Sequence, residues 1–248
     1  MPRHARKQSS SGIYHIVLRG INRQNIFEDE EDKKKFLETL DRYKAISEYK
    51  LFAYCLMSNH IHLLIRIGKE SLDTVVKRIA GSYVYWYNWK YSRCGHLFQD
   101  RFKSEPVEED SYFLTALRYI HQNPVRAGVC KYIEDYRYSS YLAYIKENSF
   151  VDTDFCFGII DCEQFIEFHN RYDDQQCLEL DEKKFRLTDE KAMCIIQKVC
   201  KCKNATEFQQ LDLIKRDKYL KLCREKGISI RQLSRLTGVS FHIIRNLR

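Results

Sequence analysis

Two hydrophobic patterns alternate along the N-terminal half of the chain. Residues 60–67 alternate apolar and polar side chains, and residues 12–20 are rich in aromatic and β-branched residues between two glycines, which is typical of strands. Other segments place apolar residues three or four positions apart, as along one face of a helix. Strands are predicted over 12–20, 51–57, 60–67 and 97–107, and helices over 29–49, 71–89 and 110–122.

The order of these elements predicts the fold class. The first six are those of the split β-α-β arrangement, in which an antiparallel sheet carries helices on one face. We therefore predict an α+β fold, a ferredoxin-like sandwich, with a helical C-terminal extension. The other face of the sheet is expected to stay open for a ligand.

The composition changes in the second half of the chain. Residues 152–182 are acidic with Arg171 as their only base, whereas the chain from Leu213 onward is strongly basic. The predicted domains are an N-terminal domain over 1–147, an acidic and mostly helical connecting region over 148–212, and a basic segment over 213–248.

The basic segment has the pattern of capping and turn residues that is typical of a helix-turn-helix. Ser229 can cap a short helix, Gly238 can form the turn, and Ser240 can cap a last helix. Apolar residues suited to hold the two helices together are Leu233, Val239 and Ile244, and those left free on a DNA-recognition helix are Phe241, His242, Arg245 and Arg248. The alternative is a helical hairpin that packs on the main domain.

Composition and charge indicate which cellular location and which class of partner to expect. The 248 residues carry a formal charge of +8, which fits a nucleic-acid partner, although a basic solvated surface gives the same sum. Ten scattered cysteines without a C-x-x-C pair indicate reduced thiols. No leader or membrane-spanning run is visible, so a cytoplasmic location without a membrane partner is expected.

The pair His60 and His62 is the first candidate for chemistry. Strand alternation places both imidazoles on one face, with Ile61, Leu63 and Ile65 on the other. A metal ion would account for two imidazoles leaving the same face. The alternative is a pair of exposed or hydrogen-bonded histidines.

A second motif gives the pair a partner. The stretches 59–63, Asn-His-Ile-His-Leu, and 119–126, Tyr-Ile-His-Gln-Asn-Pro-Val-Arg, together resemble the single-tyrosine HUH transposases, and most closely their REP-associated tyrosine transposase branch. The resemblance covers about residues 1–145, with supporting similarity at residues 95–103 and 136–144.

This resemblance implies a reaction on single-stranded DNA, at a hairpin with a short adjacent guide sequence. The hydroxyl of Tyr119 would attack a phosphodiester and form a 5′-phosphotyrosine bond, assisted by one divalent ion, Mg²⁺ or Mn²⁺, held by His60 and His62. A third ligand would come from one helical turn after the tyrosine, where this chain has Asn123. Pro124 is expected to end or distort the helix there, so Gln122 is an alternative. Relatives act as monomers or as homodimers.

Other side chains were assigned by charge and pattern. Histidines expected in the core or on the surface, outside the catalytic set, are His15 and His121. Cations with the right charge for DNA phosphates are Arg19, Arg23, Arg101 and Lys103. Aromatic residues for which core packing is favoured over base stacking are Tyr85, Trp86 and Trp89.

Two other functions use the same fold without cleavage. One is a domesticated DNA-binding protein or repressor, and the other is an RNA-binding module. The intact His60, His62 and Tyr119 argue against the first, and the lack of an aromatic RNA-binding signature on the strands argues against the second. His60→Ala is expected to abolish metal-dependent cleavage and leave the fold intact.

Overall fold

The chain folds into two compact units, Met1–Leu180 and Asp181–Arg248. The structure is a computed structural model, and it describes residues 6–99, 101–146, 149–171, 189–202 and 205–247. The division lies after Leu180, whereas the sequence predicted boundaries after residues 147 and 212. The difference arises because residues 149–170 pack into the first hydrophobic core, and residues 192–202 and 207–211 into the second.

Four antiparallel strands form the sheet of the N-terminal unit. They are β1 (Ile13–Arg19), β2 (Lys50–Leu56), β3 (His60–Arg66) and β4 (Lys103–Pro106). Their order across the sheet is β2-β3-β1-β4, with β3 and β1 in the centre. This topology confirms the predicted α+β sandwich.

The fourth strand is shorter than predicted. Regular pairing with β1 covers only residues 103–106, not 97–107. Residues 97–99 follow the end of β1 through single backbone contacts, in which Ile21 donates to Leu97 at 3.0 Å and Gln99 donates to Arg19 at 2.7 Å. An isolated bridge between Gly20 and Phe98 completes this junction.

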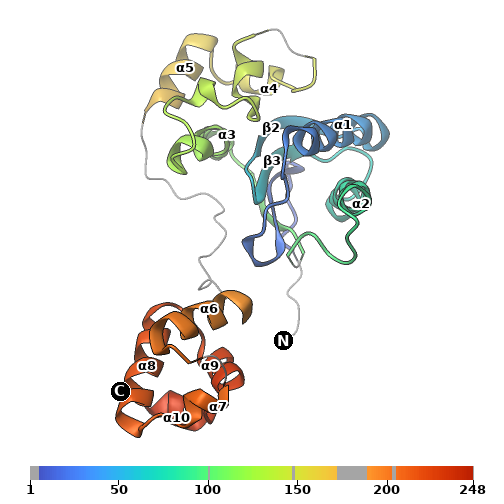
Figure 1. Cartoon of the computed structure of the whole chain (residues 1–248). Helices are drawn as coiled ribbons and strands as arrows, with labels where there is room; N and C mark the ends of the chain where they lie inside the picture. The colour runs from blue at the N-terminus through green and yellow to red at the C-terminus, as the bar shows by residue number, and fades with distance from the viewer. Residues whose placement is uncertain (1–5, 100, 147–148, 172–188, 203–204, 248) are drawn as a thin grey trace. The chain divides into compact units, whose positions relative to one another are not determined.

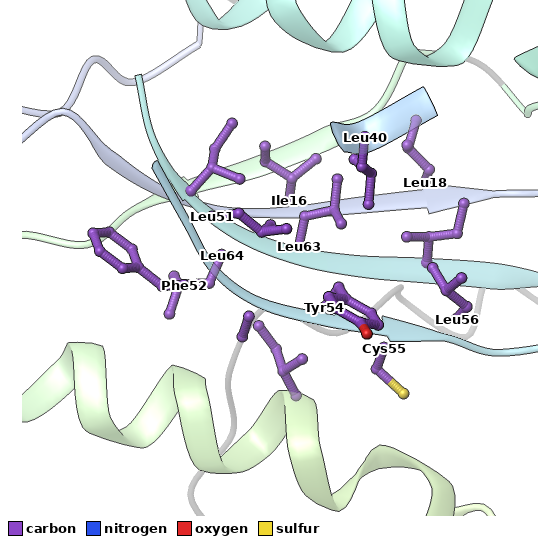
Figure 2. Packing of buried hydrophobic residues seen from close by; sticks show 14 of the residues in the cluster. Ile16, Leu18, Leu40, Leu51, Phe52, Tyr54, Cys55, Leu56, Leu63 and Leu64 are labelled. Carbon is purple, nitrogen blue, oxygen red and sulfur yellow. The ribbon is translucent and has the colours of Figure 1, made fainter. Parts of the chain in front are cut away.

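Two helices cover one face of the sheet, as predicted (Figure 1). They are α1 (Glu30–Ser47), which begins at a capping box on Asp29, and α2 (Leu72–Lys90), which Ser71 caps. Figure 2 shows Ile16, Leu18 and Leu63 on the same side of the sheet as Leu40 of α1. The one-face alternation of these strands thus builds the core between the sheet and the two helices.

The other face is not open, contrary to the prediction. Helix α3 (Asp110–Arg126) lies against it, and Phe113 packs edge-on to Phe52 of β2 with ring centroids 5.2 Å apart. Helices α4 (Asp154–Phe157) and α5 (Cys162–Asn170) add to the same core. Three short 3₁₀ turns complete the unit: η1 (Ile21–Arg23), η2 (Ile133–Asp135) and η3 (Ser140–Tyr144).

Helices α3 and α5 are joined by buried histidines. His121 lies 3.0 Å from His169, ring nitrogen to ring nitrogen, and 2.7 Å from the Ser140 hydroxyl. His169 in turn donates from Nδ1 to the carbonyl of Phe165 at 2.9 Å. His121 is therefore a hydrogen-bonded core residue, as the sequence suggested, and the acidic segment supplies a packing partner for the helix that bears Tyr119.

The C-terminal unit is helical. Its elements are α6 (Asp189–Cys200), α7 (Ala205–Gln209), α8 (Leu213–Glu225), α9 (Ile230–Thr237) and α10 (Phe241–Asn246). Gly238 ends α9 in the left-handed conformation, φ 69°, which favours glycine. Leu233, Val239 and Ile244 are buried in one cluster, as predicted. Throughout the described residues, no helix is long and apolar enough to cross a membrane, and every cysteine is a free thiol.

Candidate active site

The candidate site lies on the face of the sheet that α3 covers. In the antiparallel register of β1 and β3, Val17 is opposite His62 and Arg19 is opposite His60. His60 and His62 are two residues apart on β3, so both rings leave the same face, and their centroids are 5.0 Å apart. His62 is buried, whereas His60 is half-buried.

Helix α3 brings Tyr119 onto these rings. The Tyr119 ring centroid is 5.6 Å from that of His62 and 5.9 Å from that of His15, both in edge-on geometry. The guanidinium carbon of Arg126 lies 5.3 Å from the Tyr119 centroid. Tyr119 keeps 8% of its surface exposed. The two sequence motifs, residues 59–63 and 119–126, therefore meet at one place although they are far apart in the chain.

The proton position on His60 follows from its neighbours. The Asn59 side-chain amide donates from Nδ2 to the carbonyl of Arg23 at 3.3 Å, which leaves its Oδ1 to accept from His60 Nδ1 at 2.7 Å. A neutral His60 ring that donates from Nδ1 keeps the lone pair of Nε2 available for a ligand. Asn59, which lies in the turn between β2 and β3, thus orients the His60 ring.

His15 has a role that the sequence did not predict. It is fully buried, and its Nε2 lies 3.0 Å from Nδ1 of His62. When the proton of this bond is on His62 Nδ1, the lone pair of His62 Nε2 is free, as in metal sites where a second group orients a ligating histidine. The period of β1 places His15 on the same face as Arg19, but only the register with β3 sets it beside His62.

Burial keeps all three imidazoles neutral. Burial lowers the pKa of His15 to about 3, and burial together with repulsion from His15 and His60 lowers the pKa of His62 well below its usual value. Burial also lowers the pKa of His60 to about 4; a side-chain hydrogen bond with Asn123 opposes this effect, and the positive charge of Arg19 adds to it. Neutral rings are the form that binds a metal ion.

Asn123, not Gln122, faces the histidines. A side-chain hydrogen bond with Asn123 raises the pKa of His60, so Asn123 lies beside this ring. Its Nδ2 donates to the carbonyl of Tyr119 at 3.2 Å. Gln122 instead donates to the carbonyls of His169 at 2.8 Å and Arg171 at 3.2 Å.

Pro124 does not end the helix, contrary to the prediction. Helix α3 continues to Arg126, and Ala127 still donates to the carbonyl of Asn123 at 3.0 Å. A proline this close to the C-terminal end removes one helical hydrogen bond, and the following turn is still made. Asn123 therefore stays one turn after Tyr119 on a continuous helix.

The donor set fits a cation. Asn123 lies beside His60, and the ring nitrogens that do not bond Asn59 or His15 are Nε2 of His60 and Nε2 of His62. Among the described residues, no group of three or more His, Cys, Asp or Glu side chains could hold a metal ion. An ion at this place would have two imidazoles and an amide oxygen as protein ligands, and its other ligands would be water or DNA oxygen.

The predicted phosphate-binding cations divide between two regions. Arg19 lies close enough to His60 to lower its pKa, and Lys103 is opposite Val17 in the register of β1 and β4. Arg23 meets the site through its backbone carbonyl. Arg101 lies elsewhere, 3.7 Å from Asp73 of α2, so the structure does not bring it to the histidines.

The aromatic residues of α2 depart from their predicted core positions. Tyr85 and Trp89 are 80% and 75% exposed, and only Trp86 is partly buried. The apolar series on the buried face of α2 is completed by Tyr83 and Tyr87, which leaves Tyr85 and Trp89 on the opposite side.

The residues of this site lie in a segment that is similar to known proteins. Residues 8–123 match the family model described as transposase IS200 like, and the match contains His60, His62 and Tyr119. Residues 8–123, which make up just under half of the chain, are therefore similar to the IS200-like transposases. The predicted resemblance is therefore confirmed over residues 8–123.

Relatives of the transposase domain carry related names. A Haemophilus influenzae protein provisionally named REP-associated tyrosine transposase is 26% identical over 157 residues, which are 57% of this chain and 86% of that protein. A solved structure described as a REP-associated tyrosine transposase bound to a REP hairpin covers 61% of this chain and 94% of its own, with 15% identity and a TM-score of 0.50. That match shows a shared fold. A Deinococcus radiodurans protein provisionally described as a transposase covers 54% and 97%, with 18% identity and a TM-score of 0.35.

The remaining predicted DNA-binding residues lie outside the matched transposase residues. Phe241, His242 and Arg245 are exposed on α10. Arg224 of α8 donates to the carbonyls of Ile244 at 3.4 Å and Leu247 at 3.2 Å. These two bonds give partners to carbonyl groups at the C-terminal end of α10. Arg248 is outside the described residues.

Proposed function

We propose that this protein is a metal-dependent DNA-nicking and strand-transfer enzyme that acts on single-stranded DNA beside a hairpin. The observation that supports this most directly is the convergence of Tyr119 with His60 and His62, with ring centroids 5.6 Å apart for Tyr119 and His62 and 5.0 Å for the two histidines. A structural neighbour is described as bound to a REP hairpin, which supports a DNA hairpin as the partner.

The proposed nucleophile is the hydroxyl of Tyr119. Its oxygen attacks the phosphorus of a phosphodiester, a tyrosine–phosphorus bond forms, and the bond to the 3′ oxygen breaks. The phenol loses its proton and the departing 3′ oxygen takes one up, so the products are a 5′-phosphotyrosine and a free 3′-hydroxyl. Strand transfer is the reverse attack by another 3′-hydroxyl, and it needs no nucleotide cofactor because the phosphotyrosine retains the bond energy.

The side chains around Tyr119 favour negative charge in the transition state. A free phenol has a pKa of about 10, so the developing phenolate and phosphate charges both need stabilisation. Arg126 is beside the Tyr119 ring, and Arg19 is beside His60. Both guanidiniums are positioned to attract phosphate oxygens.

His60, His62 and Asn123 are the residues that would hold a divalent ion. A bound ion would act as a Lewis acid on a nonbridging phosphate oxygen and orient the phosphodiester for in-line attack. Nitrogen ligands suit Mn²⁺ better than Mg²⁺, although either ion meets the charge requirement. Asn59 and His15 would fix the orientation of the two imidazoles.

His60→Ala should test both the ion and the reaction. We expect the variant to lose at least about tenfold in Mn²⁺ affinity, because one of two imidazole ligands is removed, and to lose metal-dependent cleavage of labelled hairpins from the gene's own flanks. The fold should persist since His60 is only half-buried. Titration calorimetry and a denaturing gel, with the ion or with a chelator, measure the two effects.

His96→Ala is the matched control, since His96 is an exposed histidine on the loop after α2. It should bind Mn²⁺ and cleave like the wild type. Cleavage and metal binding that are unchanged in His60→Ala would remove the metal-site assignment. Hairpin binding by the wild type without a covalent product, with either ion, would favour the domesticated DNA-binding protein.

The C-terminal helices are proposed to add affinity for duplex DNA as a helix-turn-helix. Arg245→Ala should weaken duplex binding and reduce the slope of log affinity against log salt by about one, as expected for one lost phosphate contact. Lys198→Ala removes an exposed cation from α6 of the same unit and should leave the slope unchanged. Fluorescence anisotropy at several salt concentrations measures this, and equal slopes in both variants would contradict a recognition role for α10.

A further inference from the structure

Helix α2 carries two aromatic side chains that the fold does not use. Tyr85 and Trp89 are 80% and 75% exposed, and they are four residues apart, so they are neighbours on one face of the helix. Within the described part of the chain, neither ring contacts another ring or a cation. If a partner covered these two rings, the apolar area removed from water would be larger than for most other exposed side chains.

The same line continues toward a cationic residue. Gly81 precedes Tyr85 by four positions, and a Cβ atom there would meet nothing within 4 Å, so the surface is open. Lys77 precedes Gly81 by another four positions and is exposed, without an ion-pair partner among the residues that the structure describes. We name Lys77, Gly81, Tyr85 and Trp89 the α2 stripe.

A cavity of about 310 Å³ begins at the Lys77 end of the α2 stripe. Phe98 and Phe102 contribute to its apolar wall, and the cations beside Lys77 are Arg101 and Arg6, which lies over the Phe102 ring. The acid in the lining is Asp73, whose carboxylate pairs with Arg6 and lies 3.7 Å from Arg101. An apolar wall beside cations suits a ligand with flat rings and negative charge.

We propose that the α2 stripe and this cavity bind unpaired nucleotides of single-stranded DNA, with bases stacked on Tyr85 and Trp89 and phosphates at Lys77 and Arg101. Stacking of bases on aromatic side chains along a positively charged path is how proteins bind single strands without sequence preference. The helix rise over four residues is about 6 Å, close to twice the roughly 3.4 Å between stacked DNA bases, so a base can lie between the two rings.

Size and charge favour DNA over a protein partner. Two aromatic rings bury about 300–500 Å² in total, below the roughly 800 Å² that each partner contributes to a standard protein interface. The other two positions of the stripe are a glycine and a lysine, which add no further ring. The overall charge of +8 adds attraction for a polyanion.

Residues 97–99 connect this surface with the proposed active site. Leu18 lines the cavity, and the next residue on β1, Arg19, points to the opposite face, where it lies beside His60. Gln99 donates to the carbonyl of Arg19 at 2.7 Å. The inference rests on the proposed function, because the DNA flanking the cleaved phosphodiester would follow this edge from Arg19 to Arg101 and Lys77.

The test uses the full chain and fluorescently labelled DNA hairpins with and without a single-stranded oligo-dT extension. Binding is measured by anisotropy in a chelator, so that it is separated from cleavage. For the wild type, the extension should increase affinity. In the double variant Tyr85→Ala/Trp89→Ala, affinity for the extended hairpin should fall by about tenfold or more, and affinity for the blunt hairpin should stay the same.

Two further variants make the result specific. Tyr132→Ala removes a tyrosine that is 53% exposed elsewhere in the same unit, and it should bind both hairpins like the wild type. Tyr85→Phe/Trp89→Phe retains flat rings and should keep most of the gain from the extension. Loss of affinity in the Tyr85→Ala/Trp89→Ala variant with recovery in the Phe variant supports stacking.

Different failures identify different errors. A wild type that binds the blunt hairpin and gains nothing from the extension overturns this inference alone. A wild type that binds neither hairpin overturns the proposed function as well. Sedimentation that shows a wild-type dimer, a monomeric Tyr85→Ala/Trp89→Ala variant and no effect on the extended hairpin would assign the α2 stripe to a second copy of the chain.

Discussion

Tyr119→Phe is expected to abolish the covalent protein–DNA product and to reduce cleavage by a factor on the order of 10⁴ or more, as loss of a nucleophile does in other enzymes. The variant keeps the ring that packs edge-on to His62 and His15, at 5.6 and 5.9 Å, and removes only the attacking oxygen. Metal binding and hairpin binding should therefore remain. A denaturing gel with labelled hairpin and Mn²⁺ measures covalent product and nicking together.

Tyr112→Phe is the matched control for this experiment. Tyr112 lies two turns earlier on the same helix, and its hydroxyl bonds the Glu105 carboxylate instead of facing the histidines. Cleavage should be close to that of the wild type in this variant. A covalent band that persists in Tyr119→Phe would show that another group attacks the phosphodiester, and the role assigned to α3 would be wrong.

Acidification is expected to destabilise the N-terminal unit strongly. A buried hydrogen-bond chain links α3 and α5 through two histidines. The Phe165 carbonyl only accepts, so His169 carries its proton on Nδ1 and accepts at Nε2 from Nδ1 of His121. His121 Nε2 lies 2.7 Å from the Ser140 hydroxyl oxygen, and that hydroxyl also donates to the carbonyl of Tyr54 at 3.2 Å.

Burial keeps both rings neutral in the folded unit. Burial lowers the pKa of His169 to about 3, and the Phe165 carbonyl opposes this effect only in part. Burial, followed by repulsion from His169, lowers the pKa of His121 well below its usual value. Below about pH 6.5 the unfolded chain therefore binds protons that the folded unit does not, and stability falls as pH falls.

The size of this loss follows from the linkage relation. At about pH 5, each ring that stays neutral in the folded state lowers the free energy of unfolding by about 2 kcal/mol relative to its value at neutral pH. For His121 and His169 together, the decrease is about 4 kcal/mol. That is a large part of the 5–15 kcal/mol by which domains are typically stable. The loss continues until the pH reaches the folded-state pKa, about 3 for His169.

Urea unfolding at several pH values measures this effect through tryptophan fluorescence. Both tryptophans, Trp86 and Trp89, lie in α2, so the signal follows the N-terminal unit alone. The double variant His121→Gln/His169→Gln should be less stable at neutral pH and show a shallower decline toward pH 5. His96→Ala should decline like the wild type. A decline that is equally steep in the double variant would locate the acid sensitivity in other groups.

Local patterns were sufficient for most of the fold. The apolar periodicity placed α1 and α2 within two residues of their observed ends, where Asp29 and Ser71 cap the helices. Long-range packing accounts for the errors. Residues 97–99 contact the end of β1 without continuing β4, and Pro124 lies near enough to the end of α3 for the helix to continue through it.

The candidate site was predicted in part, and His15 shows why the rest was missed. Alternation on β1 assigns His15 to a face, but its contact with His62 depends on a register between strands that are 47 positions apart. The choice of Asn123 over Gln122 depends on α5, whose residues His169 and Arg171 accept from the Gln122 amide. No periodicity on α3 contains that information.

The sequence by itself determined the local elements, the shared face of His60 and His62, and the motif that includes Tyr119, because these depend on spacing within one strand or one helix. Tertiary structure alone decided which face α3 covers, that His15 bonds His62, and that Tyr85 and Trp89 remain exposed. The physical reason is that burial and hydrogen-bond partners depend on contacts between distant segments, whereas periodicity specifies only the direction in which each side chain leaves its own backbone.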